Sequence, residues 1–151
     1  TEFLIQFDGV GTNSKDRVLV IGATNRPQDL DAAVLRRLPK KLFVGPMDFT
    51  GRENFIKEIM KKEANNLSKS DLEKIAEKTE NYSNSDLKEL CRQACTEPIR
   101  ELKIGQIEKI KKLREIELND FLMAVKNVRG TLNKEILDEY ENWNKDNGAV
   151  N

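Results

Sequence analysis

The sequence predicts an α/β segment followed by an all-α part, and two observations lead to this prediction. Residues 18–23 form a run that is apolar on both faces and partly β-branched, which is typical of a strand buried in a parallel sheet between layers of helices. From residue 50 onward, apolar residues recur at helical spacing almost throughout. The change of pattern after Gly45 and Pro46 places a boundary near residues 45–50.

The composition points to neither a nucleic acid nor a membrane. Of the 151 residues, 38% are hydrophobic and 34% charged, and the 26 Lys and Arg residues balance the 26 Asp and Glu residues. Without a net field we expect no nucleic-acid contact. No apolar run approaches the ~18 residues that a membrane span needs. Cys91 and Cys95 are four residues apart in a chain without histidine, so we expect core packing in a reduced intracellular protein, with no metal site.

The part before the boundary is typical of the end of an α/β layer. Residues 1–7 have an amphipathic helical pattern without an initiator Met, so the chain is expected to be a piece of a longer protein. After the strand at 18–23, Asp31 can cap a short helix over residues 32–37, and residues 41–44 form a second predicted strand. Two strands cannot close an α/β domain, so this part is expected to pack on a missing half.

The part after the boundary carries repeated start signals for helices. Three residue pairs have capping-box spacing: Thr50 with Glu53, Ser70 with Glu73, and Ser83 with Asp86. Asn119 can cap a further helix, and a last helix is expected from about residue 134. Pro98 should kink the long helix that starts after Ser83. The predicted core positions of that long helix are Leu87, Leu90, Cys91, Ala94 and Ile99.

Asn25 is the first candidate for chemistry. It follows the predicted strand at 18–23, and ligands of open α/β sheets bind outside the carboxyl ends of the strands. An amide at this point can orient a water molecule and bond a phosphate. An Asn in a turn can also bond its own backbone, and spacing alone favours this turn interpretation.

Arg36 and Arg37 are the next candidates. Two adjacent guanidinium groups at the end of a short helix can contact a transferring phosphate. Cations at a helix C-terminus also interact favourably with the helix dipole. On their own, the two arginines favour this structural interpretation.

Taken as a whole, residues 22–37 resemble the second region of homology of AAA ATPases. The matching positions are Gly22, Ala23, Thr24, Asn25, Arg26, Pro27, Leu30, Asp31, Ala33, Arg36 and Arg37. Residues 1–10 resemble the family helix that follows the second pore loop, and residues 82–87 resemble the start of a lid-domain helix. Residues 98–102 and 140–146 are similar to the meiotic group of the family, which includes spastin, fidgetin and katanin. The resemblance covers almost the whole chain.

The resemblance implies a fold and two domains. Residues 1–48 would be the C-terminal part of the AAA large α/β nucleotide-binding domain, and residues 49–151 the small helical lid domain with the C-terminal helix. We expect Tyr140 and Trp143 to anchor that last helix on the protein. In the family, the same helix also supports ring assembly.

The resemblance also implies roles for five residues. Asn25 falls on sensor 1, which orients the water that attacks the γ-phosphate of ATP. Arg36 and Arg37 fall on the arginine fingers, which act on the ATP of a neighbouring subunit and so imply a ring, usually a hexamer. Asn84 and Ser85 fall where the lid helix approaches the adenosine.

The sequence departs from the family pattern at two positions and lacks two of the family's motifs. Asn81 and Asn84 stand where the family motif has glycines. Asn tolerates the left-handed backbone better than most residues, while the side chain of Asn84 affects how closely the backbone can approach a nucleotide. The sequence contains neither a G-x-x-x-x-G-K-[ST] loop (Walker A) nor an apolar strand ending in Asp-Glu (Walker B). The phosphate loop and the Mg²⁺ ligands are therefore expected outside this chain, which alone should be inactive as an ATPase.

The expected function is that of the full-length parent. The resemblance implies an enzyme that hydrolyses ATP with Mg²⁺ in a hexameric ring to remodel a protein polymer, with tubulin in microtubules as the expected substrate. Alternatives are a fidgetin-like ATPase acting on recombinase filaments and, from another class, a non-catalytic helical interaction module. An ESCRT-disassembling ATPase is disfavoured, because residues 102–119 leave too little room for the β-rich insertion of its lid. We expect a cytoplasmic, cytoskeleton-associated or nuclear location.

Overall fold

The protein forms two compact units, which we call the helical unit and the split unit. The computed structural model describes residues 18–103 and 112–148, so the helix predicted for residues 1–7 lies outside the described residues. The helical unit is Gly45–Leu137. The split unit combines Thr1–Val44 with Asp138–Asn151. The predicted division into domains 1–48 and 49–151 assigned the whole last helix to the lid, and as an assignment of functional domains it stays a prediction.

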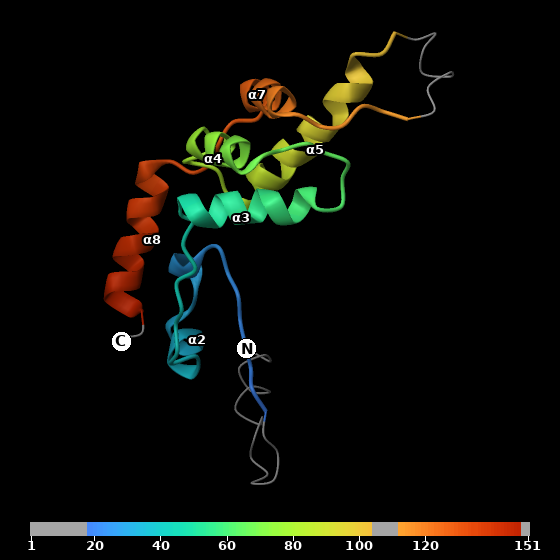
Figure 1. Ribbon diagram of the computed structural model, residues 1–151. Coiled ribbons are helices and arrows are strands. Elements are labelled where there is room, and N and C mark those ends of the chain that lie inside the picture. Colours follow the sequence, from blue (N-terminus) through green and yellow to red (C-terminus); the bar gives the residue numbers. More distant parts are fainter. Residues whose placement is uncertain (1–17, 104–111, 149–151) are drawn as a thin grey trace. The chain divides into compact units, whose positions relative to one another are not determined.

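Among its described residues, four helices lie wholly within the helical unit (Figure 1). They are α3 (Phe49–Met60), α4 (Lys69–Glu77), α5 (Asn84–Arg100) and α7 (Leu118–Asn127). Helix α5 packs against both α3 and α7, and α4 also contacts α3 and α7. Helices α3 and α7 therefore each contact both α5 and α4.

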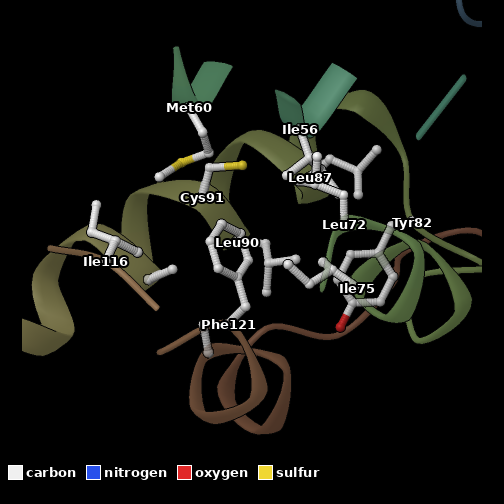
Figure 2. Packing of buried hydrophobic residues seen from close by; sticks show 12 residues of the cluster. Ile56, Met60, Leu72, Ile75, Tyr82, Leu87, Leu90, Cys91, Ile116 and Phe121 are labelled. Carbon is white, nitrogen blue, oxygen red and sulfur yellow. The ribbon is translucent and has the colours of Figure 1, made fainter. Parts of the chain in front are cut away.

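The core of the helical unit receives side chains from all four helices. Ile56 of α3, Leu87 and Leu90 of α5, and Phe121 of α7 are each 0% exposed. In Figure 2, Phe121 points from α7 into the cluster that the other helices line. Cys91 is 1% exposed in the same cluster, which confirms its predicted core position.

Pro98 changes the core pattern of α5. The helix continues through Pro98 to Arg100, and Pro98 itself is buried. It extends the buried stripe that runs from Leu87 to Ala94, because positions three and four residues apart share a helix face. Ile99 consequently turns outward and is 45% exposed, so its predicted core position is wrong.

The helix starts are partly as predicted. The capping box of Ser83 and Asp86 is present: Ser83 N–H donates to Asp86 Oδ2 at 2.8 Å, and Asp86 N–H donates to Ser83 Oγ at 3.2 Å. Three other helices of this unit start two residues earlier than predicted. The side chains of Asp48 and Ser68 cap two of them, and at the third the N–H of Glu117 donates to Asp120 Oδ2 at 2.8 Å. Their N-caps are Asp48, Ser68 and Glu117 in place of Thr50, Ser70 and Asn119.

The split unit contains short helices and no strand among its described residues. Helix α2 (Ala32–Arg37) follows the 3-10 turn η1 (Pro27–Asp29), and Asp31 caps α2 by accepting from Ala33 N–H at 2.6 Å, as predicted. The strands predicted at 18–23 and 41–44 are wrong, since neither run has regular structure. A strand needs a partner for its ladder of hydrogen bonds, and no partner strand is present in the described chain.

Helix α8 (Lys134–Asn147) belongs to both units. Its first residues are part of the helical unit, and from Asp138 onward it is part of the split unit. The start predicted near residue 134 is confirmed. Asn133 precedes the helix, and its side chain accepts from Ile136 N–H at 2.8 Å.

Candidate functional site

Asn25 lies in a turn whose backbone its neighbours fix. The N–H of Arg26 donates to Thr24 Oγ1 at 3.0 Å, and the carbonyl oxygen of Asn25 accepts from the Tyr140 hydroxyl at 2.8 Å. The side chain that closes the turn is thus that of Thr24, and not the Asn25 amide that the turn interpretation would use. Asn25 is exposed, so its amide is open to a ligand.

Arg36 and Arg37 form the last turn of α2 and differ in environment. Arg36 is exposed, whereas Arg37 is partly buried and its Nη1 donates to Ala33 O at 3.2 Å, one turn back along the helix. Both cations are at the end of the helix that the dipole favours for positive charge. Asp31 at the other end complements the same dipole.

Asn84 and Ser85 are the first two residues of α5, and both are exposed. Because Asn84 is already helical, no left-handed backbone is required at that position. The first N–H groups of a helix have no partner within the helix, and they favour a polar or negative ligand group. Ligand binding at Asn84 and Ser85 stays a prediction.

The segment between α7 and α8 holds the start of α5 in place. Thr131 donates to Asp86 Oδ2 from its N–H at 2.9 Å and from its hydroxyl at 2.7 Å. The Tyr82 hydroxyl donates to Val128 O, and Leu132 N–H donates to Asn81 O at 3.3 Å. A side chain at position 130 would collide with the Asn81 carbonyl, which explains the glycine found there.

Asp86 is the charged centre of this arrangement. Its burial alone would raise the pKa of the carboxyl group, but hydrogen bonds from Thr131 and Ser83 outweigh that effect and hold the pKa below its ordinary value. Asp86 is therefore ionised at neutral pH. As a carboxylate it accepts bonds that fix the 81–86 turn to the segment around Thr131.

The structure assigns the predicted site residues to separate units. Asn25, Arg36 and Arg37 lie in the split unit, and Asn84 and Ser85 lie in the helical unit. Sequence reasoning treated Tyr140 as an anchor of a helix that in the family also supports ring assembly, and missed its bond to Asn25. The two residues are 115 positions apart, so no local pattern connects them.

Two surface hollows and a buried thiol lie elsewhere in the described chain. Two surface hollows of the helical unit contain none of the predicted site residues; one is lined by Asn66, Asp71 and Glu117, the other by Glu53, Lys57 and Lys61. Burial raises the pKa of the Cys91 thiol to about 12, so this sulfur is neither a ready nucleophile nor a ready metal ligand. Among the described helices, none is both long and apolar enough to cross a membrane.

Three protein-family models match the chain. The model of the ATPase family associated with various cellular activities (AAA) matches residues 1–46, and the AAA+ lid domain matches residues 69–123. The Vps4 C-terminal oligomerisation domain matches residues 99–148. The order of the AAA and lid matches agrees with the predicted fold class, the end of an AAA α/β domain followed by a helical lid.

Curated relatives include spastins from several animals. The chain is 45% identical to spastin of Ixodes scapularis over 152 residues, which cover 99% of this chain and 24% of that protein. It is 43% identical to spastin of Danio rerio over 150 residues, covering 98% of this chain and 26% of that protein. The chain thus spans about a quarter of the length of these spastins.

Solved structures of the same family have the same fold. The FIGL-1 AAA domain in complex with ADP matches with a TM-score of 0.92 and 37% identity, over 99% of this chain and 51% of that chain. A katanin structure, described for katanin self-assembly, matches with a TM-score of 0.79 and 27% identity, over 94% of this chain and 50% of that chain. The chain therefore belongs to the AAA family, as the C-terminal part of an AAA ATPase domain with its lid, and its relatives include spastin, FIGL-1 and katanin.

Proposed function

We propose that the full-length protein containing this chain is an AAA ATPase that assembles into a hexameric ring and severs microtubules. The observation that carries the proposal is the arrangement of residues 24–37. An exposed Asn25 stands on a turn with a fixed backbone, and a capped helix follows that ends in Arg36 and Arg37. The similarity to spastins along 98–99% of this chain supports microtubules as the substrate.

In this proposal the catalytic groups come from two neighbouring subunits. Asn25 orients the water that attacks the γ-phosphate of the ATP bound by its own subunit. Arg36 and Arg37 reach the ATP of the adjacent subunit and stabilise the charge of the transferring phosphoryl group. Asn84 and Ser85, exposed at the start of α5, approach the adenosine. One subunit alone then has an incomplete site, which makes hydrolysis depend on the ring.

ATP is the substrate of the proposed reaction, and Mg²⁺ its metal. Among the described residues, no group of three or more His, Cys, Asp or Glu side chains could hold a metal ion. We therefore expect the Mg²⁺ ligands and the phosphate loop elsewhere in the full-length protein. On its own, this chain should not hydrolyse ATP.

Ring assembly has support from the C-terminal part of the chain. Residues 99–148 match the Vps4 C-terminal oligomerisation domain, and the similar katanin structure concerns self-assembly. Helix α8 lies within the matched range. We propose that α8 contributes to contacts between subunits, in a protein located in the cytoplasm on the cytoskeleton.

The test is a mixing experiment with the full-length protein. Asn25→Ala and Arg37→Ala are each expected to lower ATP turnover by roughly 1,000-fold or more. In an equal mixture, about a quarter of the subunit contacts combine an intact Asn25 with an intact Arg37 of the neighbour, as in any head-to-tail ring. Turnover should then return to as much as about a quarter of the wild-type value. Lys40→Ala, which changes an exposed cation beside the motif, is the control and should behave as wild type.

Each outcome has a defined meaning. A mixture that stays as inactive as its components would contradict action of Arg37 on a neighbouring subunit. An Asn25→Ala protein with full turnover would remove Asn25 from the reaction. Adding microtubules should raise wild-type turnover and lead to severing; an ATPase indifferent to microtubules would instead favour another polymer, such as recombinase filaments.

A further inference from the structure

The last helix contacts the proposed catalytic turn through a hydrogen bond. The hydroxyl of Tyr140 on α8 donates to the backbone carbonyl of Asn25 at 2.8 Å. Both residues belong to the split unit. The contact is therefore internal to one unit and does not depend on where the helical unit lies.

A second aromatic side chain lies beside Tyr140. The rings of Phe43 and Tyr140 have centroids 6.5 Å apart and are inclined by 38°. Tilted aromatic pairs at such distances are favourable. Three segments distant in sequence thus meet at Tyr140: the turn at Asn25, the run that contains Phe43, and α8.

The peptide group between Asn25 and Arg26 is held at both ends. Its carbonyl oxygen accepts from Tyr140, and its N–H donates to Thr24 Oγ1 at 3.0 Å. With both polar groups bonded, rotation of this peptide plane would break two hydrogen bonds. The two bonds restrain rotation about the Cα–C bond of Asn25 and so help to hold the backbone from which its exposed side chain extends.

We propose that Tyr140 is a positioning residue for ATP hydrolysis, which acts by holding the backbone of Asn25. This inference rests on the proposed function, in which the Asn25 amide orients the attacking water. Groups that orient a reactant must be held to within a fraction of an ångström, and small displacements lower the rate strongly. Helix α8 then contributes to the hydrolysis step, in addition to any contribution to assembly.

The test compares Tyr140→Phe with wild type in the full-length protein. The Phe variant keeps the aromatic ring beside Phe43 and removes only the hydroxyl. We expect kcat for ATP to fall about three- to tenfold, as for the loss of one hydrogen bond, with KM for ATP and the ring population in light scattering unchanged. Lys40→Ala, which changes an exposed cation outside α8, is the control and should keep the wild-type kcat.

A second variant tests the other end of the peptide group. Thr24→Val keeps the side-chain shape and removes the acceptor for Arg26 N–H, so it should also lower kcat without changing ring assembly. In single-turnover experiments, both losses should appear in the hydrolysis step, which a purely structural change in assembly would not alter selectively.

The outcomes separate this inference from the proposed function. If Asn25→Ala abolishes turnover and Tyr140→Phe retains the wild-type kcat, the positioning role is wrong and the proposed function stands. A Tyr140→Phe protein that loses activity only in proportion to lost rings would also overturn the positioning role. If Asn25→Ala itself retains full turnover, the failure lies in the proposed function.

Discussion

The helical unit and the split unit differ most in what they bury. In the helical unit, Ile56, Leu87 and Phe121 are 0% exposed and belong to one cluster. In the described residues of the split unit, no residue is buried, and Leu19 and Val44 are 81% and 89% exposed. One unit therefore has its own core, and the other presents apolar side chains that nothing in the described chain covers.

The buried core and the residues proposed to act on phosphate lie in different units. The unit with the core carries Asn84 and Ser85, whereas the three residues proposed to act on phosphate are all in the unit without one. Side chains such as Val44 and Leu19 account for the apolar pattern that predicted buried strands. The similar FIGL-1 structure is a chain of about twice this length. We expect parts of the full-length protein that cover this apolar surface to stabilise the split unit as a whole, while Thr24 and Tyr140 hold the turn at Asn25.

The largest expected effect tests the core of the helical unit. Phe121→Ala removes a side chain that is 0% exposed, and should lower the free energy of unfolding by about 3–5 kcal/mol. Urea denaturation followed by circular dichroism measures this change. Met123→Ala, on the same helix at 41% exposure, is the control and should cost less than about 1 kcal/mol. Equal losses in both variants would contradict the assigned core.

A smaller effect is expected at the turn that precedes α5. Asp86→Ala removes the acceptor for Thr131 and Ser83 and should lower the free energy of unfolding by about 1–3 kcal/mol. Thermal denaturation of the chain measures it, with the exposed Glu80→Ala as the control. A loss no larger than that of the control would show that the bonds of Thr131 do not hold this turn.

The same carboxylate predicts a dependence on acid. The folded pKa of Asp86 lies below its unfolded value because its hydrogen bonds outweigh the opposing effect of burial. Its contribution to stability is therefore complete above the unfolded value of about 4 and is lost as pH falls through the lower folded pKa. Urea midpoints at pH 7 and pH 2.5 should differ less in Asp86→Asn than in wild type. An equal difference in both proteins would contradict this role of Asp86.

The smallest expected effect concerns the split unit. Ile21→Ser changes a side chain that is 81% exposed, so in this chain alone it should alter the free energy of unfolding by less than about 0.5 kcal/mol. In the full-length protein the same substitution should cost several times more, if other elements cover the run at 18–23. Equal small effects in both proteins would contradict the expectation that this apolar surface is covered.

Local signals predicted the helices well and the long-range contacts poorly. The cap of α2 at Asp31 and the capping box of Ser83 and Asp86 depend on residues at most three positions apart, which the sequence displays directly. Cap positions failed where two capping residues compete within a few positions, as Asp48 and Thr50 do. The choice between them depends on backbone geometry that composition does not reveal.

Neither the exposure of the apolar runs nor the long-range contacts of the site could be predicted from the sequence. The apolar pattern at 18–23 predicts a strand buried in a sheet. The described chain provides no partner strand, so the predicted strand is absent. The bond between Tyr140 and Asn25 joins residues 115 positions apart, and only folding brings them together. The motif at 22–37 includes Asn25 and Thr24, and the structure adds the hydrogen bonds by which Thr24 and Tyr140 hold the turn.

The two crossings of the chain between its units affect how deletions should be interpreted. The chain leaves the split unit after Val44 and returns to it inside α8, after Leu137. In connectivity, the helical unit is an insertion within the split unit. A protein truncated after Leu137 would lose the hydroxyl that bonds Asn25 together with most of the helix matched to an oligomerisation domain. Loss of activity after such a truncation would combine two defects, and only a substitution as small as Tyr140→Phe separates them.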